Sequence, residues 1–400
     1  MVYLHIPFCK SFCTYCAFYS ELFSSEQASR YEAAVKTELR TRQQEIRETL
    51  SVPTLYIGGG TPSVLPPMVL RRLVEAVGEV TGGAYQEFTV EVNPDDVTPA
   101  YAAFLKTLGV TRVSMGVQSF DDRTLAWMGR RHTAEGARQA FSCLREAGFE
   151  NVSVDLIYGL VAPVGAERDV RPGLSSLNAD LDALLSLPGG PPEHISAYQL
   201  SIEDGSALYD QVRKGRYQEC ADEDAALQYD AVCSRLREAG YEHYEISNFA
   251  LASATGADAR TGAASAACRA LHNSAYWTGA PYVGLGPAAH SYDGARRSWN
   301  PPDTEAYIRY WNSLSSGPAD PTGAPDFEIL TPEQRAIERV MLSLRTSDGI
   351  PETELRDLCG NARVDALLGR SHLEKSVKNA NLRIPERCGF ISDAIIADLV

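Results

Sequence analysis

Six apolar, strand-like runs alternate with helical segments in the first half of the chain, and this alternation limits the fold more than any other feature. The expected strands are Val2–Ile6, Thr54–Ile57, Phe88–Val92, Arg112–Gly116, Val152–Ile157 and His194–Leu200. The expected helices are Glu26–Leu50, Pro66–Val80, Thr98–Leu108, Thr133–Ala147 and Val170–Leu187. A repeated strand–helix–strand order produces parallel strands joined by right-handed crossovers. The sequence therefore predicts an α/β fold, and the spacing alone leaves open whether the sheet is open or an incomplete barrel.

Each expected strand ends in residues that can do chemistry. In chain order these are a cysteine loop, Gly58-Gly59-Gly60-Thr61-Pro62, Glu91-Val92-Asn93-Pro94, Gly116-Val117-Gln118-Ser119, Asp155, and Tyr198-Gln199. Barrels of parallel strands build one active site from the carboxyl ends of their strands. The pattern therefore favours a barrel-like sheet with a single site at that end.

The cysteine loop carries Cys9, Cys13 and Cys16 in the spacing C-x3-C-x2-C, interleaved with aromatic residues. Three thiolates can hold three irons of a [4Fe–4S] cluster and leave the fourth iron open to another ligand. A structural zinc site with His5 as a fourth ligand is the main alternative. Disulfides are disfavoured, because nine cysteines are an odd number spread thinly over 400 residues. We expect a redox centre at this loop.

The composition limits the classes of partner and location. The chain is 44% hydrophobic, which predicts a large core and two domains. Its net charge of −15 argues against nucleic acid as a partner, although Arg130 and Arg131 can form a local basic pocket. The chain shows neither a run of about eighteen apolar residues nor an export leader. With reduced thiols, this predicts a cytoplasmic protein.

Beyond Leu200 the pattern changes. We expect a helix at Asp222–Ala239, a strand at Tyr241–Ser247, a mobile loop in residues 251–270, a linker at Ser316–Asp326 and a helix at Pro332–Leu344. The last segment has the proportions of a small winged-helix domain. The domains expected are a barrel with an extension in residues 1–250, a loop-and-linker segment in 251–326, and a helical domain in 327–400.

Single site residues also have structural interpretations. The glycine run can be simply a tight turn, and Glu91 or Asp155 can cap the next helix as well as bind a ribose diol or an ammonium group. His5 is expected to have a structural role beside the cysteines rather than to act as a ligand.

Taken together, the motifs resemble the radical S-adenosylmethionine (SAM) superfamily. The resemblance rests on Tyr3-Leu4-His5-Ile6-Pro7-Phe8-Cys9, the cysteine loop, Gly-Gly-Gly-Thr-Pro, Glu-Val-Asn-Pro, Gly-Val-Gln-Ser-Phe and Val-Asp-Leu-Ile-Tyr-Gly-Leu, in this order. It implies a partial (β/α)6, TIM-like barrel in which Cys9, Cys13 and Cys16 hold the [4Fe–4S] cluster. It further implies that SAM contacts Tyr3, Gly59, Gly60, Thr61, Glu91, Gln118, Arg130 and Asp155. An electron from the reduced cluster would then cleave SAM to methionine and a 5′-deoxyadenosyl radical.

Within that superfamily the chain resembles the coproporphyrinogen III dehydrogenase branch, which contains porphyrin-making oxidases and HemW-type heme chaperones. Three features favour the chaperone type. The oxidases add a cysteine after the third ligand, where this chain has Ala17-Phe18, and they carry a long segment before the cluster motif, which is short here. The stretch His272-Asn273-Ser274-Ala275-Tyr276-Trp277 resembles the one that carries the heme-binding histidine, although Ala270-Leu271 separate it from Arg269.

The resemblance implies a protein that binds heme, through His272, and passes it to an apo-hemoprotein such as a respiratory membrane enzyme. It also implies an electron donor, allows a homodimer, and would bring a cytoplasmic protein to the membrane surface through its partner. The alternative is an oxidase that makes protoporphyrinogen IX by radical decarboxylation of coproporphyrinogen III. Catalytic residues for that reaction are not identified.

Overall fold

A nine-stranded sheet forms the centre of the molecule in this computed structural model, which describes residues 1–161, 173–252, 268–314, 321–376 and 379–400. Its strand order is β11-β1-β4-β5-β6-β7-β8-β10-β9. The six predicted strands lie side by side in parallel and match the sequence expectation to within two residues at each end. They are β1 (Val2–Ile6), β4 (Thr54–Gly59), β5 (Glu87–Val92), β6 (Arg112–Gln118), β7 (Val152–Tyr158) and β8 (His194–Gln199). Because these six parallel strands are neighbours in chain order, the sheet is an incomplete barrel rather than an open sheet.

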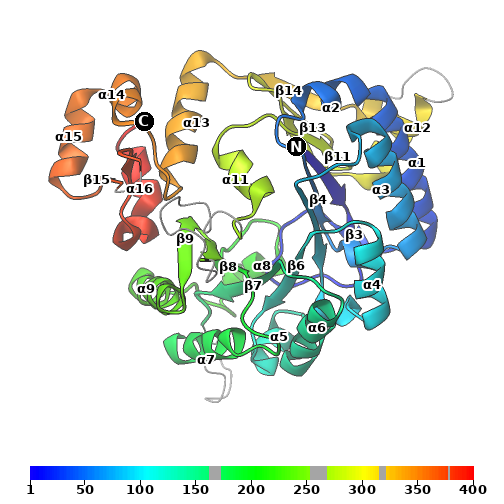
Figure 1. The fold of residues 1–400 in the computed structure, drawn as a ribbon, viewed down its shortest axis with the longest axis horizontal. Helices are drawn as coiled ribbons and strands as arrows, with labels where there is room; N and C mark the ends of the chain where they lie inside the picture. Colours follow the sequence, from blue (N-terminus) through cyan, green and yellow to red (C-terminus); the bar gives the residue numbers. More distant parts are fainter. Residues whose placement is uncertain (162–172, 253–267, 315–320, 377–378) are drawn as a thin grey trace.

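Helices cover the outside of this sheet (Figure 1). They are α1 (Ser25–Thr41), α2 (Gln43–Thr49), α3 (Pro67–Thr81), α4 (Pro99–Thr107), α5 (Asp122–Trp127), α6 (Ala134–Glu146) and α7 (Leu174–Leu185). The expected start of the last helix, residues 170–172, lies outside the described residues. Strand side chains that point outward, such as Leu55, Val90 and Val154, pack with these helices in one large core.

The helix expected at Glu26–Leu50 is in fact two helices, and the prediction of a single helix is wrong. The chain leaves α-helical geometry at Arg42, where φ is −100° and ψ is 13°. The Arg42 guanidinium donates to Glu38 Oε1 at 2.9 Å and to the Gly284 carbonyl oxygen at 2.9 Å. The break thus coincides with a residue that ties the helix to a segment about 240 residues away.

Three strands extend the parallel sheet at its edges. β11 (Val283–Leu285) pairs in parallel with β1 on one side. On the other side, β10 (Asn248–Leu251) and β9 (Tyr241–Glu245) continue the sheet beyond β8 in antiparallel pairing. The strand expected from Tyr241 is confirmed as β9, whereas β10 and β11 were not expected.

The later part of the chain adds smaller elements around the barrel. They are α8 (Ala207–Arg213), α9 (Asp222–Glu238), α11 (Leu271–Trp277), α12 (Thr304–Ser313) and a small sheet of β12 (His290–Tyr292), β13 (Arg296–Trp299) and β14 (Asp326–Ile329). The short strands β2 (Phe8–Cys9) and β3 (Glu21–Leu22) pair at the base of the cysteine loop. Most of the predicted mobile loop (253–267) and the start of the predicted linker (316–320) lie outside the described residues.

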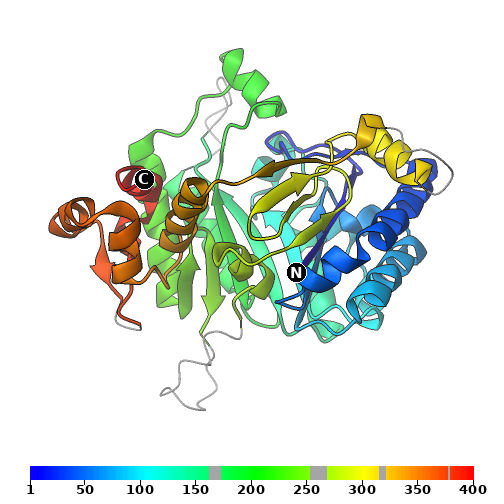
Figure 2. The same cartoon turned by 90° about the horizontal axis from the view of Figure 1, so that it is seen from above.

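The carboxyl-terminal region has a hydrophobic core of its own, which includes Val340, Leu355 and Ile395. Its elements are α13 (Pro332–Leu344), α14 (Glu352–Cys359), α15 (Asn361–Gly369), the hairpin β15 (Glu374–Lys375) and β16 (Leu382–Arg383), the 3-10 helix η4 (Glu386–Ile391) and α16 (Ser392–Ala397). Figure 2 shows this region, in orange and red, at the opposite end of the molecule from the blue amino-terminal helices. The exact domain boundaries stay a prediction. None of the described helices is long and apolar enough to cross a membrane.

Candidate functional site

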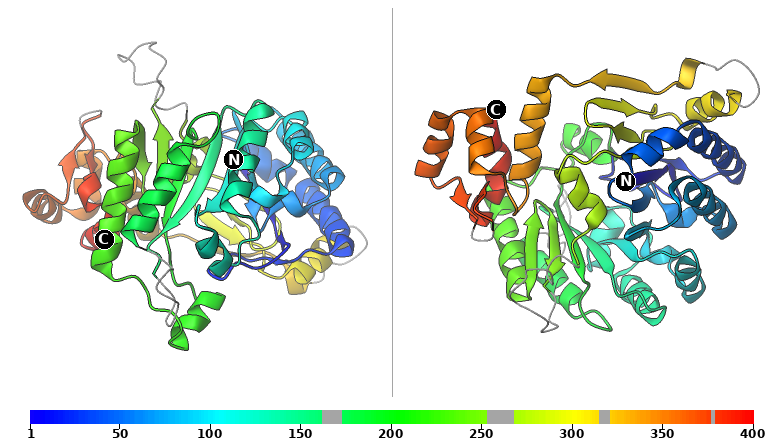
Figure 3. Two further views of the ribbon diagram at one scale, coloured as in Figure 1. Left: turned by 90° about the horizontal axis from the view of Figure 1, so that it is seen from below. Right: turned by 45° about the horizontal axis from the view of Figure 1, so that its top comes forward.

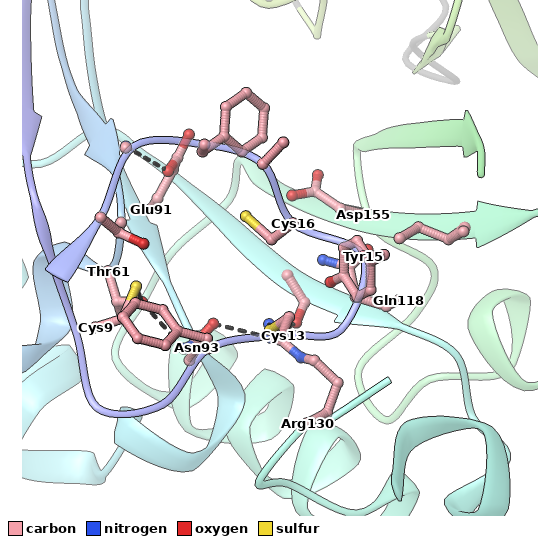
Figure 4. Close-up of a pocket in the computed structure, with 18 of the residues that line it drawn as sticks. Cys9, Cys13, Tyr15, Cys16, Thr61, Glu91, Asn93, Gln118, Arg130 and Asp155 are labelled. Carbon is pink, nitrogen blue, oxygen red and sulfur yellow. Dashed lines mark hydrogen bonds between the residues drawn. The ribbon is translucent and has the colours of Figure 1, made fainter. Parts of the chain in front are cut away.

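A cavity of about 1120 Å³ occupies the inside of the barrel. Residues of β6 show how the sequence builds it, because side chains alternate between the two faces of a strand. Arg112, Ser114, Gly116 and Gln118 line the cavity, while the residues between them, such as Val113, pack against the outer helices. The loop with Cys9, Cys13 and Cys16 lies over the carboxyl ends of the strands, and all three cysteines contribute to the lining (Figure 4).

The cysteine loop is anchored through the backbone and the hydroxyl group of Thr14. The Thr14 N–H donates to the Met128 carbonyl at 2.9 Å, and the Thr14 hydroxyl donates to the Trp127 carbonyl at 2.9 Å. The Thr14 carbonyl accepts from the Leu208 N–H at 2.8 Å. These contacts fix the loop without using a cysteine side chain. All three thiols are free, and burial raises the pKa of Cys16 to about 11.

The zinc alternative for this loop does not fit the geometry. Two sulfur atoms bound to one zinc ion lie at most about 4.6 Å apart, because each Zn–S bond is about 2.3 Å long. In the described parts of the chain, the one set of three Cys, His, Asp or Glu ligand atoms within 4.8 Å of one another lies elsewhere. His5 offers no fourth ligand either. Its ring nitrogens contact the Tyr3 hydroxyl and the Tyr19 carbonyl, both at 3.0 Å, and burial lowers its pKa to about 4. Three thiols spread around one loop suit a cluster of irons better than a single ion.

The glycine run at the end of β4 forms a turn that only glycine can make. Gly59 has φ of +108°, and a Cβ there would lie 2.5 Å from the His5 ring. A Cβ on Gly60 would lie 2.8 Å from the Phe8 carbonyl oxygen. The N–H groups of Gly59, Gly60 and Thr61 already donate to Glu91, Ile6 and Phe8. The turn therefore offers a ligand the Thr61 hydroxyl and carbonyl oxygens, which are acceptors suited to an ammonium group.

Two carboxyl groups from neighbouring parts of the sheet face the cavity. Glu91 accepts from the Tyr56 hydroxyl at 2.7 Å and from the Gly59 N–H at 3.1 Å, so it also holds the glycine turn in place. Asp155 accepts from the Ser114 hydroxyl at 3.3 Å. Burial raises the pKa of Glu91 to about 7 and that of Asp155 to about 6. Both groups thus titrate near neutral pH, where a bound cation or hydrogen-bond donor shifts their ionisation.

A chain of hydrogen bonds links the cysteines to the strand ends. Arg130 donates to Cys13 Sγ at 3.4 Å, to Asn93 Oδ1 at 2.9 Å and to the Gly116 carbonyl. Asn93 donates to the Thr61 hydroxyl at 3.3 Å, and that hydroxyl contacts Cys9 Sγ at 3.4 Å. Figure 4 shows these side chains around the loop. Cys9 and Cys13 are therefore connected through this chain to Thr61 and Arg130, two of the residues expected to bind SAM.

Gln118 and Tyr3 are placed differently from one another. Gln118 ends β6 at an irregularity in the pairing with β7, and its φ of +73° is strained for a residue with a side chain. It lines the cavity. Tyr3 does not belong to the cavity lining and instead packs against Tyr56 and His5, with ring centroids 6.1 and 6.0 Å apart. Of the eight residues expected to contact SAM, Tyr3 is the one that does not line the cavity.

His272 lies on α11 at the amino ends of the strands, opposite the cysteine loop. Its Nδ1 contacts the Thr54 hydroxyl at 2.8 Å and its Nε2 the Tyr276 hydroxyl at 3.0 Å. The side chain is 1% exposed, and burial lowers its pKa to about 3. Both ring nitrogens are thus engaged within the protein. The next residue, Asn273, lines the cavity.

Two cavity residues were not identified as site residues from the sequence. Asn93 joins Arg130 to Thr61, and the motif Glu-Val-Asn-Pro was the signal that pointed to it. Arg112 is 2% exposed and lines the cavity, and its Nε has no hydrogen-bond partner among the described residues. An arginine at the first position of a buried strand was the available signal. A buried guanidinium without a full set of partners is costly, which makes Arg112 a candidate contact for an anionic ligand group.

Comparisons with known proteins agree with this site. The family model of the radical SAM superfamily matches residues 3–161. The heme chaperone HemW of Bacillus subtilis is 32% identical over 90% of this chain and 87% of its own length. The heme chaperone HemW of Mycobacterium tuberculosis H37Rv is 32% identical over 100% of this chain and 94% of its own. The structure of the Escherichia coli coproporphyrinogen III oxidase HemN covers 100% of this chain and 89% of its own, with a TM-score of 0.76 and 19% identity, which establishes a shared fold.

Proposed function

Because the chain belongs to the HemW family of heme chaperones within the radical SAM superfamily, we propose that it binds heme and delivers it to apo-hemoproteins. The observation that carries the proposal is the likeness to the chaperones over the whole chain, including the carboxyl-terminal region. Members of the superfamily use a [4Fe–4S] cluster and SAM, so these are the cofactors of this protein.

We assign the cofactors to the barrel cavity. Cys9, Cys13 and Cys16 hold the cluster, and Thr61, Glu91, Gln118, Arg130 and Asp155 surround SAM, with carbonyl oxygens of Gly59 and Gly60 facing its methionine part. Support comes from the donor set, which consists of three free thiols, and from a turn with no room for a Cβ. When bound, the reduced cluster and SAM supply one-electron chemistry. The protein orients and shields them. Arg130 positions Cys13, Glu91 holds the glycine turn, and Tyr3 supports the site from behind Tyr56.

His272 is the heme ligand in this proposal. Imidazole is a common axial ligand of heme iron, and it binds through an unprotonated ring nitrogen. Since Tyr276 and Thr54 occupy both nitrogens, one of these contacts has to open first. The Tyr276 hydroxyl is the easier to move, because it belongs to the same short helix, whereas Thr54 belongs to the sheet. Heme binding therefore includes a local rearrangement of α11.

The recipient and the electron donor are the finer parts of the proposal. We propose a respiratory membrane enzyme as the recipient, reached at the membrane surface through that partner, with a homodimer as one form of the protein. For the electron donor, two exposed aromatic side chains on the cysteine loop support docking close to the cluster. Phe12 is 56% exposed and Phe18 is 76% exposed.

The test starts with protein that has been reconstituted anaerobically and loaded with heme. We expect heme to pass to an apo-hemoprotein. The absorption spectrum of the acceptor measures this transfer. His272→Ala should weaken heme binding by about 10-fold or more, as expected for loss of an iron ligand. His290→Ala is the matched control, since His290 is exposed on β12 and outside the cavity lining. Unchanged heme affinity in His272→Ala would show that another residue binds the iron.

A second arm separates the chaperone from the oxidase. The same preparation is incubated with SAM, a strong reductant and coproporphyrinogen III, and the porphyrins are analysed after oxidation. We expect no protoporphyrinogen IX from a preparation with an intact cluster. Its formation at catalytic amounts would overturn the chaperone proposal.

A further inference from the structure

Three side chains of different chemistry meet outside the lining of the barrel cavity, where the carboxyl-terminal region joins the sheet edge. They are Cys233 on α9, His243 on β9 and Glu386 at the start of η4. In Figure 1 and in both views of Figure 3, the red carboxyl-terminal segment lies beside the green α9 and β9. His243 Nδ1 lies 3.8 Å from Cys233 Sγ and 3.3 Å from Glu386 Oε1. All three ligand atoms lie within 4.8 Å of one another.

The hydrogen bonds around His243 direct a lone pair into this gap. Its Nε2 lies 3.3 Å from the Ile246 carbonyl oxygen, which can only accept, so Nε2 carries a proton. In the neutral ring, Nδ1 is then an acceptor. A sulfur atom, an imidazole nitrogen and a carboxylate oxygen therefore converge with their lone pairs facing one another. A proton, on the thiol or on Nδ1, or a metal ion has to lie among them.

The spacing and the surroundings suit a metal ion. In a tetrahedral zinc site, ligand atoms of these types lie about 3.3–3.6 Å apart, close to the two distances found here. A metal-bound histidine typically donates its other N–H to a carbonyl, as His243 does. The second oxygen of Glu386 accepts from Arg237, and the His243 ring stacks on Phe249 with centroids 4.2 Å apart. These contacts hold two of the ligands in position.

Access and charge agree with this assignment. A second cavity, of about 320 Å³, is lined by all three side chains and leaves room for water at a fourth coordination position. A thiolate and a carboxylate balance the charge of a divalent cation, so no net charge is buried. A proton among these three groups is the competitor that the metal displaces.

We propose that Cys233, His243 and Glu386 bind a zinc ion that fastens the carboxyl-terminal region to the edge of the barrel sheet. Zinc is the fitting ion, because it accepts sulfur, nitrogen and oxygen ligands together and needs no redox partner. Two ligands come from the barrel side and one from η4, so the ion acts as a cross-link between the two hydrophobic cores. This site is independent of the cluster and of the heme.

The test uses the full-length protein with its cluster, purified anaerobically and incubated with zinc chloride before excess metal is removed. We expect one zinc per chain by elemental analysis, with one sulfur and two or three nitrogen or oxygen neighbours in zinc K-edge X-ray absorption. Cys233→Ala should lower zinc affinity on the order of 100-fold or more, because even the loss of an outer-shell partner costs 10- to 100-fold. Glu386→Gln, which preserves shape, should lower it as well.

The controls separate this site from the cysteine loop and from general damage. Cys388→Ala is matched to Cys233→Ala, since Cys388 is also buried and lies on η4, and it should leave zinc affinity unchanged. The triple variant Cys9→Ala, Cys13→Ala, Cys16→Ala should keep its zinc. Zinc with several sulfur neighbours, or zinc lost from the triple variant, would place the metal in the loop and overturn the proposal. No zinc above trace would show that a proton fills the gap, which also overturns it.

Discussion

At the scale of single residues, the cavity depends on groups whose state can change near neutral pH. Asp155 is the clearest case, because burial raises its pKa to about 6 and its carboxyl group faces the cavity from the middle of the sheet. An ionised carboxylate accepts hydrogen bonds from ribose hydroxyls more strongly than a protonated one does. Binding of a ribose-containing ligand should therefore depend on the proton on this group.

We expect Asp155→Asn to lower SAM affinity by about 10- to 100-fold above pH 7, which corresponds to the loss of charged hydrogen bonds. In the wild type, affinity should fall as the pH drops through about 6, and the variant should lose this part of the pH dependence while keeping the part due to Glu91. Equilibrium binding by calorimetry at several pH values measures both. Asp182→Asn, on the surface of α7, is the control. An unchanged pH profile in Asp155→Asn would exclude Asp155 as the titrating group.

Cys13→Ser should remove the [4Fe–4S] cluster, because a hydroxyl is a poor ligand for iron compared with a thiolate. Iron content after reconstitution and the EPR signal of the reduced protein are the measurements. Cys143→Ser, a change on α6 outside the cavity lining, should keep the full signal. A normal signal from Cys13→Ser would refute its assignment as a ligand.

The sequence was most informative for residues whose chemistry is unusual. Three cysteines, a run of three glycines and strand-end carboxylates can be recognised in one dimension, and the structure brings the cysteines, Gly59, Gly60 and the carboxylates to one cavity. Arg112 was missed because its significance depends on what lies beside it after folding. The hydrogen bonds of the two His272 ring nitrogens could not be predicted from the sequence either, since Thr54 lies 218 residues away in the chain.

At the scale of elements, α11 is held in place by one carboxylate at the amino end of β5. Glu87 accepts from the N–H groups of Leu271 and His272, at 2.8 and 3.1 Å. These are the first two helical residues, whose N–H groups have no partner inside the helix. A buried carboxylate thus links the sheet to the helix that carries the proposed heme ligand.

Glu87→Gln should loosen α11, because the amide oxygen can accept only one of the two hydrogen bonds and the amide nitrogen cannot accept the other. We expect the free energy of opening α11 to fall by about 1–2 kcal/mol, which is typical of a lost helix cap. Amide exchange in residues 271–277 should then be about 10-fold faster. Hydrogen exchange with mass spectrometry detects this change. Glu79→Gln, exposed on α3, should leave exchange there unchanged. Equal protection in both variants would mean that packing alone holds α11.

Sequence patterns predicted the long elements and failed at the short ones. The six parallel strands carry apolar runs that are readable alone, whereas β10 and β11 exist because β8 and β1 offer free edges to them. Strand formation in such short segments depends on the neighbour more than on the residues themselves. The break at Arg42 is similar, because its cause lies in contacts with Gly284 and Ser291.

At the scale of the whole molecule, polar contacts around Arg269 help to join the barrel to the carboxyl-terminal region. Arg269 donates to both oxygens of Glu242 on β9, at 3.2 and 2.8 Å, and to Asp348 at 3.0 Å. The Ser347 N–H donates to the Tyr244 carbonyl at 2.9 Å. Arg269 therefore links three separate parts of the chain at one point.

Arg269→Ala should lower the free energy of unfolding by about 1–3 kcal/mol, since it removes charged hydrogen bonds in a partly buried setting. Thermal unfolding followed by circular dichroism measures the effect. Arg370→Ala is the matched control, because within the described residues Arg370 pairs with the exposed Asp398 alone, and its effect should stay within about 0.5 kcal/mol. Equal melting temperatures for the two variants would show that Arg269 is not a structural link.

The anchoring of the cysteine loop has a consequence for how the protein recovers after oxygen destroys its cluster. Thr14 fixes the loop to Trp127, Met128 and Leu208, and Arg130 binds Asn93 and Gly116, all through protein groups other than the three thiols. We therefore expect the loop to keep its shape when the cluster is lost. A molecule whose cluster has been destroyed by oxygen would keep the shape that receives a new one. Repair would then require iron, sulfide and a reductant, and no refolding of the chain.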